Sequence, residues 1–128
     1  MGTVARLAEL PEITNDSGRW QPLNERLGIT AFGVNGVARD PEDTADIAHD
    51  ESEAGHQEVY VVVAGRAAFR LGDVEVEAGP GDVVAVADPA ETRDYRALEP
   101  GTRIVCFGAA AGEPHPYGEW ITEEASGQ

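Results

Sequence analysis

The sequence has no lysine and few basic residues of any kind. Nine arginines stand against 24 acidic residues in a chain of 128, which gives a formal net charge of −15. Without lysine, a Schiff-base mechanism is excluded. A nucleic-acid backbone or an anionic membrane surface needs a basic patch on its partner, so both are disfavoured. We therefore expect neither nucleic acid nor membrane among the partners.

Cysteine and long apolar runs are equally scarce. Cys106 is the only cysteine, so the chain can form no intrachain disulfide and no cysteine-based zinc cluster. The longest apolar run, Val59–Ala64, is far too short to span a bilayer. The first ten residues also lack the apolar segment of a secretory signal. These absences predict a cytoplasmic protein.

The length is that of a single domain, and the pattern inside it is that of short strands. Residues 1–26 form an irregular N-terminal arm, residues 27–112 a barrel, and residues 113–128 a tail that we expect to pack on the barrel. No segment from 27 to 108 shows helical periodicity. Closely spaced strands separated by turn residues predict an all-β sandwich or barrel. The predicted strands are Ile29–Ala38, Thr44–Asp50, Gln57–Ala64, Ala67–Leu71, Val74–Ala78, Val83–Val86, Thr92–Leu98 and Thr102–Gly108.

Two motifs within this region resemble those of the cupin family. The first has Glu58, six further residues and then Gly65. The second is the Pro-Gly-Asp turn at residues 80–82, followed by Val83 and Val84, with 14 residues between Gly65 and Pro80. The resemblance spans residues 45–108. It implies a small jelly-roll barrel closed around a pocket, and commonly a homodimer.

The metal-binding residues of that family are largely missing here. Metal-binding cupins have His-x-His shortly before the glutamate of the first motif and another histidine about ten residues after the second. In this sequence the corresponding positions hold Glu51, Glu53 and Thr92. Of the four ligands that the resemblance implies, only Glu58 is present. The usual site of three histidines and one glutamate therefore cannot be carried over, and we predict no metal cofactor.

The replacements leave three interpretations open. If Glu51, Glu53 and Glu58 converge inside the barrel, their like charges raise the pKa of at least one carboxyl or require a cation. A metal-free pocket could then use a glutamate as general acid or base, with Tyr60 as a donor. A hard cation could instead be bound, with His49 or His56 as an added ligand. In the third interpretation, the acidic segment is a solvated lip of the barrel.

The strand after the second motif offers two more candidates. Thr92 and Arg96 share a face of the predicted strand, so we expect both to line the pocket. An arginine inside the barrel would pair with a carboxylate and lower its pKa. Alternatively, Arg96 forms an exposed pair with Asp94. We expect Cys106, in an apolar strand, to be a buried and inert thiol.

Together these observations predict a cupin-type jelly-roll barrel that binds a small molecule without the histidine-rich metal site, with catalytic activity unassigned. The alternative is an oxygenase or isomerase that uses a divalent metal on non-standard ligands, and a third is a barrel that serves only as a scaffold. We expect a homodimer, because Val59, Val61 and Val63 face away from Glu58 and need cover. The candidate catalytic residues are Glu58 and Tyr60, and the candidate pocket-lining residues are Glu51, Glu53, Thr92 and Arg96.

Overall fold

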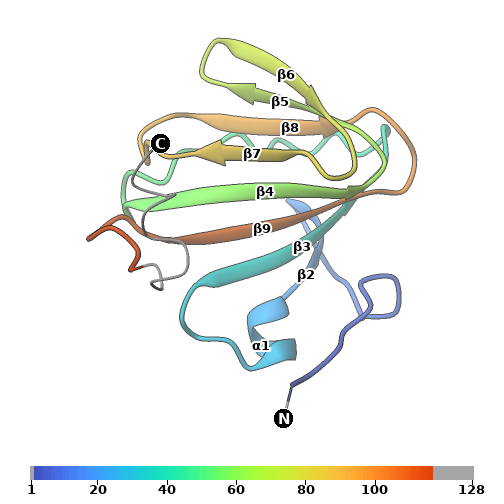
Figure 1. Cartoon of the computed structure of the whole chain (residues 1–128). Coiled ribbons are helices and arrows are strands. Elements are labelled where there is room, and N and C mark those ends of the chain that lie inside the picture. Colours follow the sequence, from blue (N-terminus) through green and yellow to red (C-terminus); the bar gives the residue numbers. More distant parts are fainter. Residues whose placement is uncertain (1, 117–128) are drawn as a thin grey trace.

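Short antiparallel strands make up nearly all the regular structure of the chain (Figure 1). The computed structural model describes residues 2–116. Its elements are β1 (Ile13–Asn15), β2 (Gly18–Gln21), α1 (Leu23–Leu27), β3 (Gly33–Arg39), β4 (His56–Ala64), β5 (Ala67–Leu71), β6 (Val74–Ala78), β7 (Val83–Val86), β8 (Arg93–Ala97) and β9 (Thr102–Ala110). The all-β class predicted from the sequence is confirmed.

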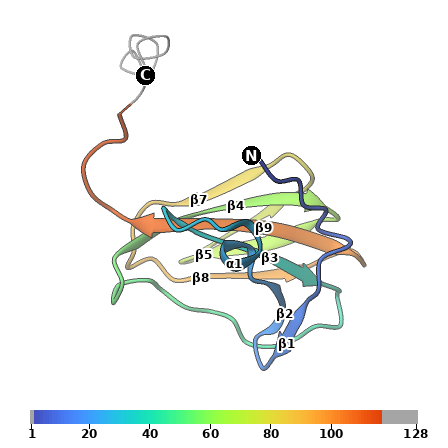
Figure 2. The same cartoon turned by 90° about the horizontal axis from the view of Figure 1, so that it is seen from below.

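The strands form two sheets. The larger has the order β1-β2-β3-β9-β4-β7 and the smaller the order β6-β5-β8. Every strand pair is antiparallel. The smaller sheet occupies the upper part of Figure 1, and Figure 2 shows the same arrangement from below. Neighbours in the sheet are distant in sequence, as in β3-β9-β4, and this is the jelly-roll arrangement predicted for the barrel.

The core lies between the two sheets and follows the alternation of each strand. In β4, Tyr60 and Val62 are buried, whereas Val63 on the opposite face is 41% exposed. Tyr60 contacts Phe69 of β5 and Tyr95 of β8, with ring centroids 5.5 and 5.7 Å apart. Aromatic rings from both sheets therefore form the centre of the core, and β4 is fixed with its even-numbered residues facing inward.

The N-terminal arm is more ordered than the sequence predicts. Residues 13–27 form β1, β2 and α1, and β2 extends the larger sheet by pairing with β3. Leu23 is 4% exposed, and Trp20 packs against the core. Elements of three to five residues are too short to show a periodic pattern, so the prediction of an irregular arm was wrong for this part of it.

Two other predictions concern a segment within the barrel and the C-terminal tail. Residues 44–50 do not form a strand; only His49 makes an isolated bridge, with Arg93. Residues 113–116 are exposed, and the rest of the tail lies outside the described residues. In the described part of the chain, no helix is long and apolar enough to cross a membrane.

Glycine is required at the turn that closes the first motif. Gly65 has φ +73°, a conformation that residues with a Cβ rarely adopt. A Cβ at this position would also come within 2.7 Å of the Thr102 Cα atom. The turn therefore needs glycine both for its conformation and for the close approach of Thr102 at the start of β9.

Candidate functional site

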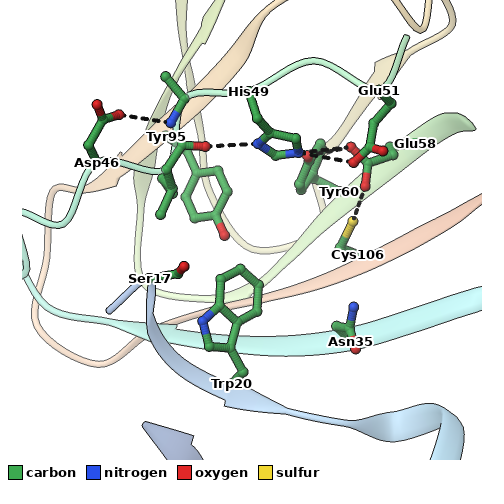
Figure 3. Close-up of a pocket in the computed structure, with 12 residues that line it drawn as sticks. Ser17, Trp20, Asn35, Asp46, His49, Glu51, Glu58, Tyr60, Tyr95 and Cys106 are labelled. Atoms are coloured by element: carbon green, nitrogen blue, oxygen red, sulfur yellow. Dashed lines mark hydrogen bonds and ion pairs between the residues drawn. The ribbon is translucent and has the colours of Figure 1, made fainter. Parts of the chain in front are cut away.

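A cavity of about 390 Å³ opens into the barrel (Figure 3). Its walls come from β2, β3, β4, β8, β9 and the segment of residues 46–51 that crosses its mouth. A volume in this range holds a small ligand. The lining residues are Ser17, Trp20, Asn35, Asp46, Ile47, Ala48, His49, Glu51, Glu58, Tyr60, Tyr95 and Cys106.

Glu58 of β4 is bound on both carboxylate oxygens. Its Oε1 accepts hydrogen bonds from Arg93 Nη1 at 2.8 Å and from the Tyr60 hydroxyl at 2.9 Å. Its Oε2 accepts one from the Cys106 thiol at 3.4 Å. Tyr60 lies two residues along the same strand and Cys106 pairs with Tyr60 from β9, so the alternation of two neighbouring strands gathers these groups on the inner face.

Arg93 is the ionic partner of Glu58, and its side chain is held in a fixed position. Its side chain is only 1% exposed, against 12% for Glu58. Beyond Glu58, its Nε and Nη2 atoms donate to the backbone carbonyls of Asp88, Pro89 and Glu91. The guanidinium is permanently charged and planar, so these bonds fix its orientation. Arg93 stands behind the carboxylate rather than on the cavity surface.

This environment keeps Glu58 ionised. Burial by itself raises the pKa of Glu58, but the hydrogen bonds from Arg93, Tyr60 and Cys106 together outweigh it, and the pKa is lowered. Burial raises the pKa of the Tyr60 hydroxyl and of the Cys106 thiol, and the neighbouring Glu58 charge adds to both shifts. Both groups therefore stay protonated and serve as donors to a carboxylate.

His49, Glu51 and Glu58 form a cluster at the mouth of the cavity. His49 Nε2 lies 3.1 Å from Glu51 Oε1 and 3.7 Å from Glu58 Oε1. His49 Nδ1 lies 2.8 Å from the carbonyl oxygen of Ile47, and a carbonyl only accepts, so Nδ1 carries a proton. In the neutral ring, Nε2 then presents a lone pair beside two carboxylates. The negative charges of Glu51 and Glu58 lie beside this nitrogen, and a cationic donor would satisfy the lone pairs of Glu51 and of a neutral His49.

Comparison with solved structures places this barrel among known folds. A cupin protein from Bacteroides fragilis aligns with 15% identity and a TM-score of 0.67, covering 91% of each chain. KdgF from Halomonas sp. aligns with 16% identity and a TM-score of 0.67, covering 88% of this chain and 97% of that one. The chain has the cupin fold. A sugar phosphate isomerase of the cupin superfamily from Silicibacter pomeroyi aligns with 15% identity over 85% of this chain and 76% of that one, with a TM-score of 0.67. No family model matches the sequence, and no curated relative does.

Because cupins of known type often hold a metal, the cluster has to be tested as a ligand set. Among the described residues, His49, Glu51 and Glu58 can each offer one ligand atom, all within 4.8 Å of one another. The Nδ1–carbonyl bond of His49 is a common support for a ligating histidine. However, Glu58 Oε1 already accepts two hydrogen bonds, and one comes from a guanidinium 2.8 Å away. A dication bound there would meet a fixed positive charge, so the residues do not fit a resident divalent metal.

The structure brings together three of the six candidate residues that the sequence suggested. Glu51, Glu58 and Tyr60 line the cavity of this cupin fold. Glu53 is exposed on the turn that follows Glu51 and is not among the lining residues. The interpretation that three carboxylates converge in the barrel is therefore wrong for Glu53.

Thr92 and Arg96 also lie outside this cavity. Thr92 is exposed, and Arg96 forms an exposed ion pair with Glu75, with a distance of 2.8 Å. The physical reason is the phase of β8: Arg93 and Tyr95 point inward, so their even-numbered neighbours point outward. The expectation that an interior arginine lowers the pKa of a carboxyl group is met, but by Arg93 and not by Arg96.

Sequence reasoning did not place Arg93, Tyr95 or Trp20 at the site, and it expected Cys106 to be a buried and inert thiol. A signal for Arg93 is present in the sequence, because Arg93 and the aromatic Tyr95 share parity on the strand and so face the same side. Cys106 is only partly buried and lines the cavity. Trp20 comes from a strand of four residues, where no pattern could have placed it.

We predict that Glu58→Gln changes how stability depends on pH. Because the pKa of Glu58 is lowered in the folded protein, its contribution is present above the ordinary glutamate pKa and is lost as the pH falls through the folded value. Breaking the buried pair should lower the free energy of unfolding by about 3 kcal/mol at neutral pH. In acid the difference from wild type should shrink, as measured by urea unfolding at several pH values.

The matched control is Glu75→Gln, which removes a carboxylate from the exposed pair with Arg96. Its effect should stay within about 0.5 kcal/mol at every pH. A Glu58→Gln deficit that remains constant down to acidic pH would contradict the assignment of Glu58 as an ionised carboxylate held by Arg93.

Proposed function

We propose that this cupin-fold protein binds a small organic cation, such as a protonated or quaternary amine, in its barrel. The observation that carries the proposal is the acceptor cluster of His49, Glu51 and Glu58 at the mouth of the cavity. A primary ammonium can donate to Glu51 and to Nε2 of a neutral His49, and the negative charge of Glu58 lies beside both groups. It also carries a single charge, so the guanidinium behind Glu58 repels it half as strongly as a dication at the same place.

The remaining walls of the cavity support the same ligand class. Asp46 adds a further carboxylate, and no arginine is among the lining residues. The aromatic rings of Trp20, Tyr60 and Tyr95 line the cavity below His49 (Figure 3). Aromatic faces attract cations, and they also cover the apolar part of an amine. Carboxylates and aromatic rings together form a pocket suited to an amphipathic cation.

The geometry favours binding over proton-transfer catalysis by Glu58 and Tyr60. A general acid needs a carboxyl that is protonated near neutral pH, and an efficient general base needs a pKa close to that pH, whereas the pKa of Glu58 is lowered. The Tyr60 hydroxyl is engaged with Glu58. In this proposal Glu58 supplies a fixed negative charge and Tyr60 stabilises it with a hydrogen bond. His49 and Glu51 are the groups that face a ligand directly.

Ligand binding is tested by calorimetric titration with choline, n-butylamine and glucose 6-phosphate. We expect one of the two cations to bind and the sugar phosphate not to bind, because the cavity presents carboxylates. Glu51→Gln should weaken the binding of the cation by at least about tenfold. Glu75→Gln, which removes the same charge from an exposed position, should change it by less than about twofold.

The contrary results are equally specific. Binding of glucose 6-phosphate in preference to both amines would show an anion site and reject the proposed ligand class. Binding of a cation that Glu51→Gln leaves unaltered would place that ligand elsewhere on the acidic surface.

We further propose that the protein forms a homodimer through the outer face of the larger sheet. Val61 of β4 pairs with Val83 of β7 and Val105 of β9, and Val59 pairs with Phe107, so their side chains form one apolar surface. Val83 is 61% exposed and Phe107 is 37% exposed. The net charge of −15 opposes self-association, and salt should screen this repulsion.

The dimer is tested by sedimentation velocity at micromolar concentration and physiological salt. We expect Val83→Glu to convert the dimer to a monomer. Val74→Glu is the matched control, since Val74 is 60% exposed but lies on β6 of the other sheet. A wild-type monomer under these conditions, or equal loss of the dimer in both variants, would contradict this interface.

A further inference from the structure

We propose that the Arg93 guanidinium is a built-in cation that replaces a divalent metal in this cupin-fold pocket and excludes one from it. The inference goes beyond the proposed function, because it does not depend on which ligand the pocket binds. It rests on where Arg93 lies, on what holds it there and on which lone pairs it occupies.

The position of Arg93 is set by the backbone. His49 and Arg93 form an isolated antiparallel bridge, with reciprocal N–H···O bonds of 3.1 and 2.9 Å. Residues directly opposite each other in such a pair project to the same face. The Arg93 side chain therefore leaves the backbone beside His49, and its Nη1 atom reaches Glu58 from that position. The cation stands next to two members of the candidate ligand cluster.

The surrounding loop fixes the guanidinium in the orientation that Glu58 requires. The Nε and Nη2 atoms donate to three carbonyl oxygens of residues 88–91, at distances from 2.8 to 3.3 Å. Only Nη1 is left for the carboxylate. These are bonds from one side chain to the backbone of a loop, so the charge cannot move away without disrupting the loop between β7 and β8.

The consequence for Glu58 is that it is already neutralised. A carboxylate that ligates a metal offers it a lone pair and a negative charge. At Glu58, Oε1 already accepts hydrogen bonds from Arg93 and Tyr60, and the positive charge of Arg93 balances that of the carboxylate. Because a dication is repelled twice as strongly as a single charge by the guanidinium, the pocket discriminates by charge number. His49 and Glu51 alone do not make a site that holds a divalent metal tightly.

Titration with Ni²⁺ alone tests this inference, with Arg93→Gln as the central variant. Glutamine removes the positive charge and keeps a donor beside Glu58. We expect Ni²⁺ to bind Arg93→Gln at least about tenfold more tightly than wild type. Arg96→Gln makes the same change of net charge at a side chain that is 62% exposed, and should match wild type within about twofold.

A second substitution locates the bound ion. Adding His49→Ala to Arg93→Gln should return the affinity to that of wild type. Equal gains in Arg93→Gln and Arg96→Gln would overturn the inference, since the gain would then reflect net charge alone. A folded Arg93→Gln that binds Ni²⁺ no better than wild type would overturn it as well.

The wild-type protein gives a further readout if Arg93→Gln fails to fold. Excess Ni²⁺ should shift the thermal midpoint of wild type and of His49→Ala equally, because no metal enters the cluster. A rise in wild type that His49→Ala abolishes would show metal binding in the presence of Arg93 and overturn the inference. These results are independent of the amine titrations, so either proposal can fail while the other stands.

Discussion

The ion pair between Glu58 and Arg93 is the interaction on which the rest of the site depends. It joins β4 of the larger sheet to β8 of the smaller sheet, with both side chains largely buried. Through its other donors Arg93 holds the loop before β8, and through its backbone it holds His49. One residue thereby ties together two sheets, a loop and the segment at the cavity mouth. Removing either partner leaves a buried charge without compensation, which is strongly destabilising.

The same pair sets the electrostatics of the cavity. Without Arg93, burial among like charges would push the pKa of a carboxyl upward and create a general acid or demand a metal. With Arg93 in place, Glu58 is ionised and its charge is balanced from behind. Glu51 and Asp46 add two further carboxylates to the lining of the cavity. In this way the cupin fold here encloses an acidic pocket with aromatic walls.

Much of the fold could be predicted from the sequence, because it depends on local signals. The alternation around Glu58 and Tyr60, the turn at Gly65 and the Pro-Gly-Asp turn before Val83 each specify their conformation within a few residues. The site could be predicted only in part. Glu58 and Tyr60 share a strand whose inward face was evident. The position of Arg93 depends on the phase of β8, and an inference from the second motif took Thr92 as the inward residue, one position too early.

Other parts of the site had no local signal at all. Trp20 reaches the cavity from a strand of four residues, and His49 is placed by a single bridge rather than a strand. Cys106 lies in an apolar strand like any core residue, and only its register opposite Tyr60 brings it to Glu58. Contacts of this kind arise from the closure of the barrel, between segments that are 35 to 48 residues apart in the chain. They are properties of the tertiary structure and not of any window of sequence.

A double-mutant cycle of Glu58→Gln and Arg93→Gln, followed by urea unfolding at neutral pH, tests the central claim most directly. If the two side chains form the pair that organises the site, each single variant is strongly destabilised and the double variant much less than their sum, with a coupling energy of about 2 kcal/mol or more. Additive effects, with a coupling energy below about 0.5 kcal/mol, would show that the two residues act independently and would contradict this account.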